Sequence, residues 1–193
     1  IRKEDPPCFL SFWKFENMRV VAGIAGGARL LAPKGLDIRP TSDRAKEAIF
    51  NSLHSRSIIE EAEVLDLFAG TGALGIEALS RGAKKAIFVD KSSESLELVK
   101  ENLKKTGFEK KAEIIKEDSV NWLQKSSKPL DLVLLDPPYG FENWPELLDI
   151  LFQKQPKIVV IESNREIDPG PKWHVDSIRQ YGSSVVVIID PNK

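Results

Sequence analysis

The sequence predicts an α/β domain with a mostly parallel β-sheet and helices on both of its faces. Five short apolar segments have the length of strands, and amphipathic helical patterns separate them. Continuous apolar strands that alternate with helices are typical of a parallel sheet buried on both faces. The 193 residues, 41% of them hydrophobic and 30% charged, suffice for a single domain with its own core.

The N-terminal part precedes this alternation. Residues 1–17 combine mixed charges, two prolines and a short aromatic patch without the apolar core of a signal peptide, so we expect a disordered extension. Residues 20–35 contain two short apolar runs around Gly26-Gly27, which predicts a β-hairpin. Residues 41–54 place apolar side chains at helical spacing behind a capping hydroxyl or carboxylate, which predicts a helix.

Residues 57–193 form the predicted core, to which a hairpin and helix in residues 18–56 are attached. Strands are expected at 64–68, 86–90, 112–116, 130–136 and 157–163, with helices near 73–81, 92–106, 119–126 and 143–153. Residues 172–190 are typical of two strands around Gly182-Ser183, and such a hairpin would close the sheet by antiparallel pairing. The predicted sheet therefore has seven strands.

Composition narrows the class of protein. The single cysteine, Cys8, excludes an intramolecular disulfide, and with only His54 and His174 no Cys/His metal cluster is expected. No apolar run approaches the ~18 residues that cross a bilayer, which predicts a cytoplasmic protein without a membrane segment. The net charge is −1, yet residues 18–56 carry seven Lys or Arg against three Asp or Glu, which suggests an anionic partner for this part.

A glycine-rich loop follows the first core strand. Residues 70–75, GTGALG, form a G-x-G-x-x-G pattern, and Asp90 lies twenty residues past its first glycine. This spacing matches dinucleotide sites, in which the acid accepts hydrogen bonds from ribose hydroxyls. Asp66 departs from that pattern, because an acid there suits the cationic amino-acid end of a ligand better than a pyrophosphate. A nicotinamide enzyme remains an alternative on the glycines alone.

A second motif, Asp136-Pro137-Pro138-Tyr139, ends the fourth core strand. Prolines have no backbone N–H, so the carbonyls of this turn remain as acceptors with a stiff direction. Asp136 adds a carboxylate and Tyr139 an aromatic plane. Acceptors beside a stacking surface predict a site for a planar ring that carries an amino group.

The D-P-P-Y tetrapeptide resembles the motif of amino-methyltransferases that use S-adenosylmethionine. Together with residues 18–23, 33–53, 65–83 and 134–139, it makes essentially residues 18–189 similar to the RsmD family. These bacterial enzymes methylate the exocyclic N2 amino group of one guanine, guanine 966, in 16S ribosomal RNA. The most specific part is the R-P-T-S-D-R segment, because many methyltransferases share the glycine loop and D-P-P-Y.

The resemblance implies a Rossmann-like class I methyltransferase domain, S-adenosylmethionine as cofactor, and 16S rRNA, within an assembling small subunit, as partner of a monomeric enzyme without metal. Two departures stand out. The hairpin has few basic residues near Gly26-Gly27, where the family usually has several. The acid after the second core strand is Asp90, followed by Lys91, where glutamate is common.

The resemblance also assigns roles to individual residues. Asp136 and the Pro137 carbonyl would accept the two amino hydrogens in the Pro138-stiffened turn, and Tyr139 would stack on the base. Candidate cofactor-binding residues are Asp66, Phe68, Ala69, Gly70, Gly72, Asp90, Lys91, Asp118, Ser119, Thr41 and Arg44. Candidate RNA contacts are Arg19, Arg29, Arg39 and Phe141. Arg39, Thr41 and Arg44 suit either the cofactor carboxylate or an RNA phosphate.

Two other functions remain open at this point. D-P-P-Y suits adenine-N6 methylation of DNA equally well, although the chain has no room for a separate base-reading domain. A cofactor-binding assembly factor that clamps ribosomal RNA without catalysis would also carry the glycine loop. Asparagine in place of Asp136 would be more typical of a protein-amide methyltransferase.

Overall fold

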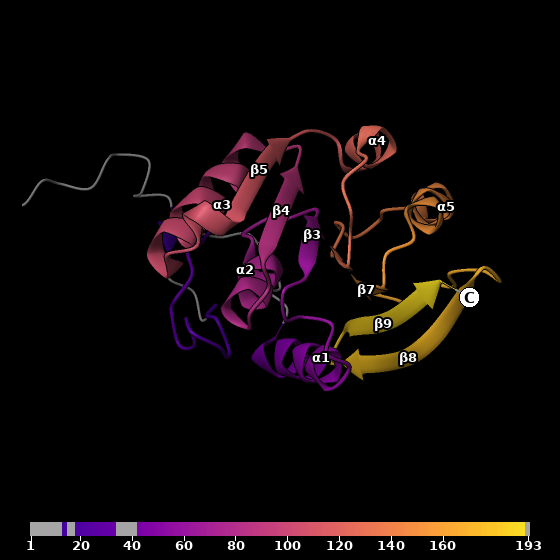
Figure 1. Cartoon of the computed structure of the whole chain (residues 1–193), viewed down its shortest axis with the longest axis horizontal. Coiled ribbons are helices and arrows are strands. Elements are labelled where there is room, and N and C mark those ends of the chain that lie inside the picture. The colour runs from indigo at the N-terminus through magenta and orange to yellow at the C-terminus, as the bar shows by residue number, and fades with distance from the viewer. Residues whose placement is uncertain (1–12, 15–17, 34–41, 192–193) are drawn as a thin grey trace, which may run out of the picture.

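The structure has the predicted mixed sheet of seven strands, and their order is β5-β4-β3-β6-β7-β9-β8 (Figure 1). The structure is a computed structural model that describes residues 13–14, 18–33 and 42–191. The strands are β3 (Glu63–Leu67), β4 (Lys85–Asp90), β5 (Ala112–Lys116), β6 (Leu132–Leu135), β7 (Ile158–Ser163), β8 (Trp173–Tyr181) and β9 (Ser184–Pro191). The first five pair in parallel, and β9 pairs antiparallel with both β7 and β8, which confirms the predicted C-terminal hairpin.

Helices cover both faces of this sheet. They are α1 (Asp43–Ser55), α2 (Ala73–Ser80), α3 (Ser93–Thr106), α4 (Ser119–Lys125) and α5 (Trp144–Lys154), with a short 3₁₀ turn at Glu109–Lys111. One hydrophobic cluster joins α1, α2 and α3 to one face, and a second joins α4 and α5 to the other. Among the described residues, no helix is long and apolar enough to cross a membrane.

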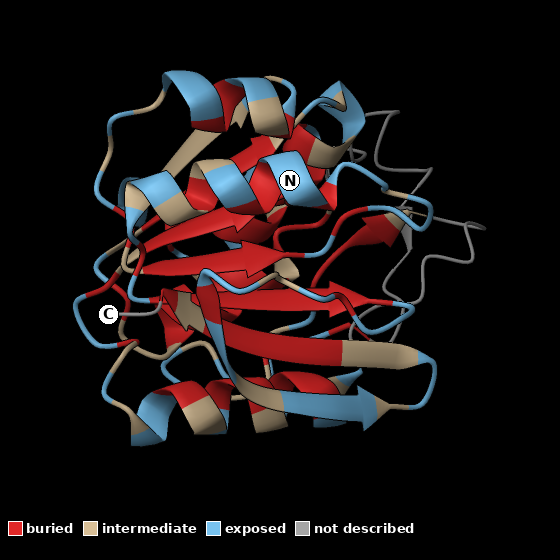
Figure 2. Ribbon diagram, turned by 90° about the vertical axis from the view of Figure 1, so that its right-hand side faces the viewer, coloured by how far each residue is buried: buried red, intermediate tan, exposed pale blue. Residues whose placement is uncertain are grey.

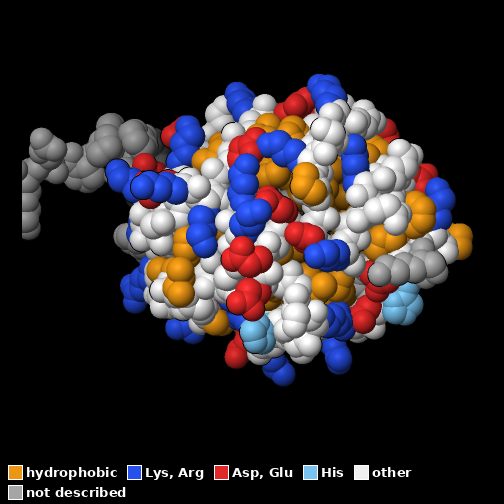
Figure 3. Space-filling view, viewed as in Figure 1, with side chains coloured by type: hydrophobic (Ala, Val, Ile, Leu, Met, Phe, Trp, Pro, Cys, Tyr) orange, Lys and Arg blue, Asp and Glu red, His pale blue; other side chains and the backbone are white. Residues whose placement is uncertain are grey.

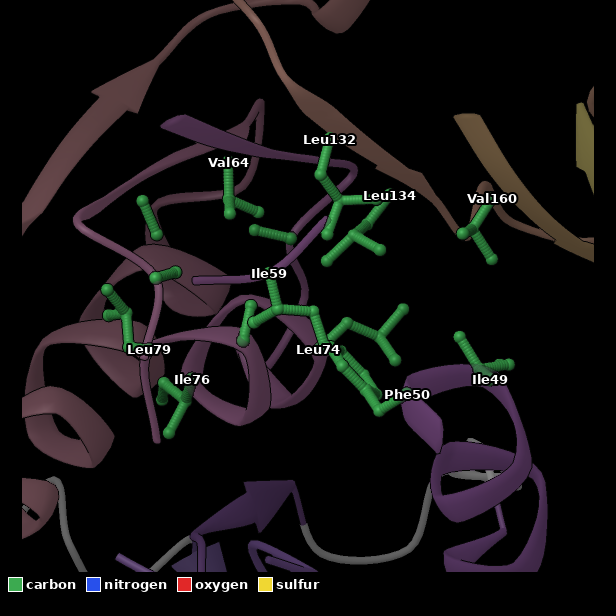
Figure 4. Packing of buried hydrophobic residues seen from close by; sticks show 14 of the residues in the cluster. Ile49, Phe50, Ile59, Val64, Leu74, Ile76, Leu79, Leu132, Leu134 and Val160 are labelled. Carbon is green, nitrogen blue, oxygen red and sulfur yellow. The ribbon is translucent and has the colours of Figure 1, made fainter. Parts of the chain in front are cut away.

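Successive side chains of a strand point to opposite faces of the sheet. The central strands are buried on both faces, because each face packs against its own hydrophobic cluster. Val64 of β3 lies in the first cluster and Leu65 in the second, so a strand buried on both faces has no polar alternation. Figure 2 shows the central strands as continuously buried, while the helices have one buried and one exposed side. In Figure 4, Phe50 of α1 and Leu74 of α2 approach each other below Leu134 of β6.

The N-terminal hairpin differs from the prediction in where its strands run. Arg19 pairs with Arg29, and β1 (Trp13–Lys14) pairs with β2 (Ala32–Pro33), so the first strand precedes residue 20. The turn begins at Gly23, where φ is +84° and a Cβ would lie 1.9 Å from the carbonyl oxygen of Ser80.

The apolar run before Gly26 is not a strand because it caps α2. Ile24 N–H donates to the Ser80 carbonyl at 2.9 Å, and Ala25 N–H donates to Ser80 Oγ at 3.0 Å. The Ser80 hydroxyl in turn donates to the carbonyl of Ala22 at 2.6 Å. These bonds satisfy groups at the end of α2 that a helix cannot satisfy internally.

Three buried polar side chains fix the hairpin to the core. Glu77 accepts the N–H groups of residues 21 and 22 at 2.6 and 3.1 Å. Asn102 exchanges two hydrogen bonds with the backbone of Leu31 and also donates to the Thr71 carbonyl in the glycine loop at 2.9 Å. Lys46 donates to the Arg19 carbonyl at 2.5 Å, and burial lowers its pKa. Because buried polar groups are costly without partners, these contacts hold the hairpin beside the glycine loop.

Candidate functional site

The strand order reverses between β3 and β6, and a cavity of about 520 Å³ opens at their carboxyl ends. Ligands of doubly wound sheets bind at such a reversal, and the volume lies within the range of small-molecule sites. Leu67 pairs with Leu135, so the glycine loop and the D-P-P-Y turn leave the sheet side by side. The cavity is lined by these predicted residues: Asp66, Phe68, Ala69, Gly70, Asp90, Lys91, Asp118, Ser119, Asp136, Pro137, Pro138, Tyr139 and Phe141.

The loop from Phe68 to Gly72 turns sharply away from β3. Phe68 and Gly70 have φ values of +70° and +54°, in the left-handed region that favours glycine. The N–H of Gly70 donates to Asp90 Oδ2 at 2.9 Å, which ties the loop to the end of the neighbouring strand. Phe68 is held by an edge contact with Phe141, with ring centroids 5.2 Å apart.

The other two glycines of the motif serve packing. Gly72 is absent from the cavity wall among the described residues, and a Cβ there would lie 3.2 Å from Val99 and 3.3 Å from Phe88, in the core. A Cβ at Gly75 would lie 2.4 Å from Phe88 and 2.9 Å from Asp66 Oδ2. These glycines therefore let α2 approach the sheet, and the cofactor contact predicted at Gly72 stays a prediction.

Asp66 joins the start of α2 to the cavity. Its Oδ2 accepts the N–H of Gly75 at 2.8 Å, while the side chain remains part of the cavity wall. Burial raises its pKa to about 7; the Gly75 hydrogen bond opposes this shift, and the nearby Asp90 carboxylate adds to it. A cationic ligand group would stabilise the charged form of Asp66 and recover the cost of burying it.

Two further acids line the cavity near the ends of β4 and β5. Each oxygen of Asp90 accepts one backbone N–H, from Gly70 and from Ser92, which fixes the carboxylate and leaves lone pairs for ribose hydroxyls. Asp118 caps α4 through Oδ1, which accepts the N–H groups of residues 120 and 121. Its second oxygen and the adjacent Ser119 remain available to a ligand in the cavity.

Asp136 projects from the end of β6 into the cavity. The residue is exposed, and it lines the cavity wall. The protein packed around the carboxyl group raises its pKa above the ordinary range, and the carboxylates of Glu162 and Asp66 raise it further. Glu162 lies nearby because Leu135 and Ile161, the residues before the two acids, pair across β6 and β7.

Tyr139 and Phe141 form the aromatic side of the site. Tyr139 is 60% exposed and lines the cavity, so its ring is accessible to a ligand. Phe141 bridges Phe68 and Trp144, with centroids 5.2 and 5.1 Å away. The buried Trp144 thus packs beneath the wall, and Phe141 faces the cavity.

Several predicted contacts lie elsewhere. Arg19 and Arg29 are exposed on the hairpin, where Arg19 pairs with Asp43 at 2.7 Å. Arg44 is exposed on α1 and does not line the cavity. Arg39 and Thr41 lie outside the described residues.

The structure adds cavity residues that the sequence did not indicate. They are Met18, Pro33, Thr71, Ala73, Leu74, Ser95 and Leu98. Met18 also accepts a hydrogen bond from Thr71 Oγ1 at 3.3 Å, so the hairpin and the glycine loop form one wall. Only the spacing of Ser95 and Leu98, three residues apart on a helix, could have signalled a shared face.

The charged residues of the cavity wall indicate which class of ligand the cavity can bind. Four carboxylates and one lysine line it, and the described residues contain no cluster of His, Cys, Asp or Glu arranged to hold a metal. A pyrophosphate would meet net repulsion in this wall, which disfavours the dinucleotide alternative. A ligand with a cationic amino-acid end, ribose hydroxyls and an amino-bearing ring matches the acceptors available.

Comparisons with known proteins agree with this geometry. The family model described as Conserved hypothetical protein 95 matches residues 18–190. YlbH of Bacillus subtilis is 37% identical over 158 residues, covering 78% of this chain and 85% of its own. The ribosomal RNA small subunit methyltransferase D of Haemophilus influenzae is 35% identical over 158 residues, covering 78% and 80%.

A solved structure extends the similarity to the fold. The structure of yhhF from Escherichia coli superposes with a TM-score of 0.76 at 25% identity, covering 90% of this chain and 97% of its own. The family match, the two relatives and the shared fold lead to one conclusion: this chain belongs to the RsmD family and has its Rossmann-like methyltransferase fold.

Proposed function

We propose that this chain transfers the methyl group of S-adenosylmethionine to the exocyclic N2 amino group of one guanine, guanine 966, in 16S ribosomal RNA. The observation that carries the proposal is the shared cavity of the glycine loop and the D-P-P-Y turn, which places acceptors for a cofactor beside acceptors for an amino group. Relatives named ribosomal RNA small subunit methyltransferase D support the RNA substrate.

The cavity wall suggests how the cofactor is held. Asp66 would bind the methionine amino group, and Asp90 would bind the ribose hydroxyls. Asp118 and Ser119, which also line the cavity, would bind the adenine amino edge. When bound, the cofactor supplies an electrophilic methyl carbon, so the protein mainly has to align the nucleophile with it.

The D-P-P-Y turn would prepare that nucleophile. The amino nitrogen of guanine shares its lone pair with the ring and gains nucleophilicity as it becomes pyramidal. Asp136 and the Pro137 carbonyl would accept its two hydrogens and stabilise the positive charge that develops on nitrogen. Asp136 need not be a strong base, because the nitrogen loses its proton only after it has attacked the methyl carbon.

Tyr139 would stack on the guanine base once that base has flipped out of its stacked position in the RNA. The exposed ring is available for this contact without rearrangement of the core. In Figure 3, Lys and Arg side chains are interspersed with Asp and Glu on the face shown, with no single basic field. We therefore favour a structured substrate, an assembling subunit, whose shape adds affinity that charge alone does not supply.

The test is transfer of labelled methyl from S-adenosylmethionine to small subunits from cells that lack this protein, followed by nucleoside analysis. The wild type should form N2-methylguanosine at one site. Asp136→Ala should reduce transfer by about a hundredfold or more, the scale of losing one preorganised transition-state group. A matched control, Asp149→Ala, removes an exposed carboxylate on α5 that pairs with Lys172, and should retain full activity.

Other products would redirect the assignment. Methyladenine on DNA would favour adenine-N6 methylation, and cofactor binding without any transfer would favour a non-catalytic assembly factor. Protein-free 16S rRNA, assayed in parallel, addresses the substrate form. A strong preference for naked RNA would contradict the assembling-subunit proposal and leave the reaction itself intact.

A further inference from the structure

A second cavity, of about 140 Å³, adjoins the cofactor cavity along the D-P-P-Y turn. The two cavities share Pro137, Pro138, Tyr139 and Phe141, so the turn stands between them. The volume is well below the ~300 Å³ at which sites enclose a whole small molecule. The second cavity is therefore suited to one ring system of a larger molecule whose remainder stays outside.

The wall away from the turn comes from residues 163–167, the loop that follows β7. The Ser163 hydroxyl donates to the Arg165 carbonyl oxygen, and Ile167 is buried in the core, so both ends of this loop are held. Asn164 and Arg165 between them are exposed and line the cavity. Within the described chain, the Arg165 guanidinium has no hydrogen-bond or ion-pair partner.

The cavity wall contains apolar and polar residues side by side, and the exposed Glu142 belongs to it as well as Arg165. Trp144 and Ile167 are buried, Tyr139 presents its ring, and the Arg165 guanidinium offers a planar set of donors. Apolar and aromatic walls with few directed polar groups are the usual construction of a site for a planar ring. Arg165 belongs to the part of the wall that the loop after β7 contributes, and the D-P-P-Y turn contributes another part.

We propose that this second cavity receives the base that is methylated and that Arg165 recognises its O6/N7 edge, which selects guanine. The inference rests on the proposed function and deepens it. With the N2 amino group held at Asp136, the O6 and N7 acceptors of guanine lie toward the opposite side of the base. Arginine binds these two acceptors through parallel hydrogen bonds, the commonest specific contact to guanine.

The same arrangement disfavours adenine. An adenine whose N6 amino group is held at Asp136 has its N7 on the side of that amino group and no O6. The guanidinium would then face an edge without the pair of acceptors. Arg165 would thus separate guanine-N2 from adenine-N6 methylation, which the D-P-P-Y turn alone serves equally well.

The experiment compares Arg165→Ala, Arg165→Lys and Arg179→Ala in the subunit assay. Arg179, exposed on β8, lines neither cavity, so its removal controls for the loss of one positive charge. We expect Arg165→Ala to lower kcat/KM by about ten- to a hundredfold, the scale of a lost bidentate base contact. Arg165→Lys should recover little of this loss, because an ammonium cannot match two acceptors in one plane.

Cofactor affinity and thermal unfolding, measured on all three variants, should match the wild type, because Arg165 lies outside the cofactor cavity and the core. A loss in Arg165→Ala no larger than in Arg179→Ala would overturn the inference. Full recovery by lysine would also overturn it, since it would indicate a phosphate contact. Either result leaves the proposed function standing if the wild type still forms N2-methylguanosine, whereas failure of the wild type would refute the function itself.

Discussion

The affinity for the cofactor should depend on the ionisation of Asp66. Its pKa is raised to about 7, mainly by burial, so the carboxyl group changes charge within the working range of the protein. A cationic amino group that pairs with Asp66 requires the ionised form. Binding should therefore weaken as the pH falls through 7.

The size of the effect follows from the two ionisations. With a pKa of about 7, roughly a tenth of Asp66 is ionised at pH 6 and roughly seven tenths at pH 7.4. The ligand's α-amino group, with a pKa of about 7.8, remains mostly protonated over this range. Together these fractions predict affinity about sixfold weaker at pH 6 than at pH 7.4.

The assay is calorimetric titration with S-adenosylhomocysteine, which keeps the amino-acid and adenosine ends of the cofactor. Asp66→Asn preserves an acceptor for the Gly75 N–H, so it should bind weakly at both pH values and lose the difference between them. Asp149→Ala should keep the sixfold difference, because it removes an exposed carboxylate outside the cavity wall. Equal affinity of the wild type at both pH values, or an unchanged difference in Asp66→Asn, would refute the reasoning.

The same pKa has an opposite consequence for the cofactor-free protein. An acid whose pKa is raised by folding binds its proton more tightly in the folded state, so its contribution to stability falls as the pH rises from about 4 to about 7. At about 1.4 kcal/mol per pKa unit, the upper bound is roughly 4 kcal/mol. Denaturant unfolding of the wild type and of Asp66→Asn between pH 4 and pH 7 measures this contribution to stability. If the free energy of unfolding of both proteins changes with pH in the same way, the expectation is contradicted.

Two further substitutions test how the site is supported. Glu77→Ala should destabilise the protein by about 3–5 kcal/mol, because it leaves Arg81 unpaired beside two unsatisfied N–H groups of the hairpin; a denaturant midpoint close to the wild-type value would argue against the docking role. Gly75→Ala should cost about 1–3 kcal/mol by overpacking against the rigid ring of Phe88, and should also weaken cofactor binding by displacing Asp66. Unfolding curves and calorimetric titration of that variant measure the two effects separately, and wild-type values in both would show that α2 can shift to accept the methyl group.

The sequence by itself determined the strands, the helices and the two motifs at strand ends. These features are local, because an apolar run of strand length or a helical repeat of apolar residues can be recognised within about fifteen residues of sequence. The glycine loop after β3 and the D-P-P-Y turn after β6 could be placed at strand carboxyl ends for the same reason. The acids Asp66 and Asp90 were recognised by their distance from the glycines.

The N-terminal hairpin is a feature that local sequence patterns did not predict correctly. The run before Gly26 has the composition of a strand, yet it caps α2, because Ser80 offers it hydrogen bonds from more than fifty residues away. Glu77 and Asn102 occupy helical positions where a polar residue would ordinarily mark the solvent face. Both are fully buried, since their partners are backbone groups of the hairpin.

Only the tertiary structure decided that one cavity contains both motifs. Residues 66–70 and 136–139 are nearly seventy positions apart, and they meet because β6 pairs with β3 at the point where the strand order reverses. It also decided that Gly72 and Gly75 lie against core side chains, and that the loop after β7 completes a second cavity. Spacing along the chain carries no record of these contacts, because they depend on which strands pair and on how much volume remains between the elements once they have packed.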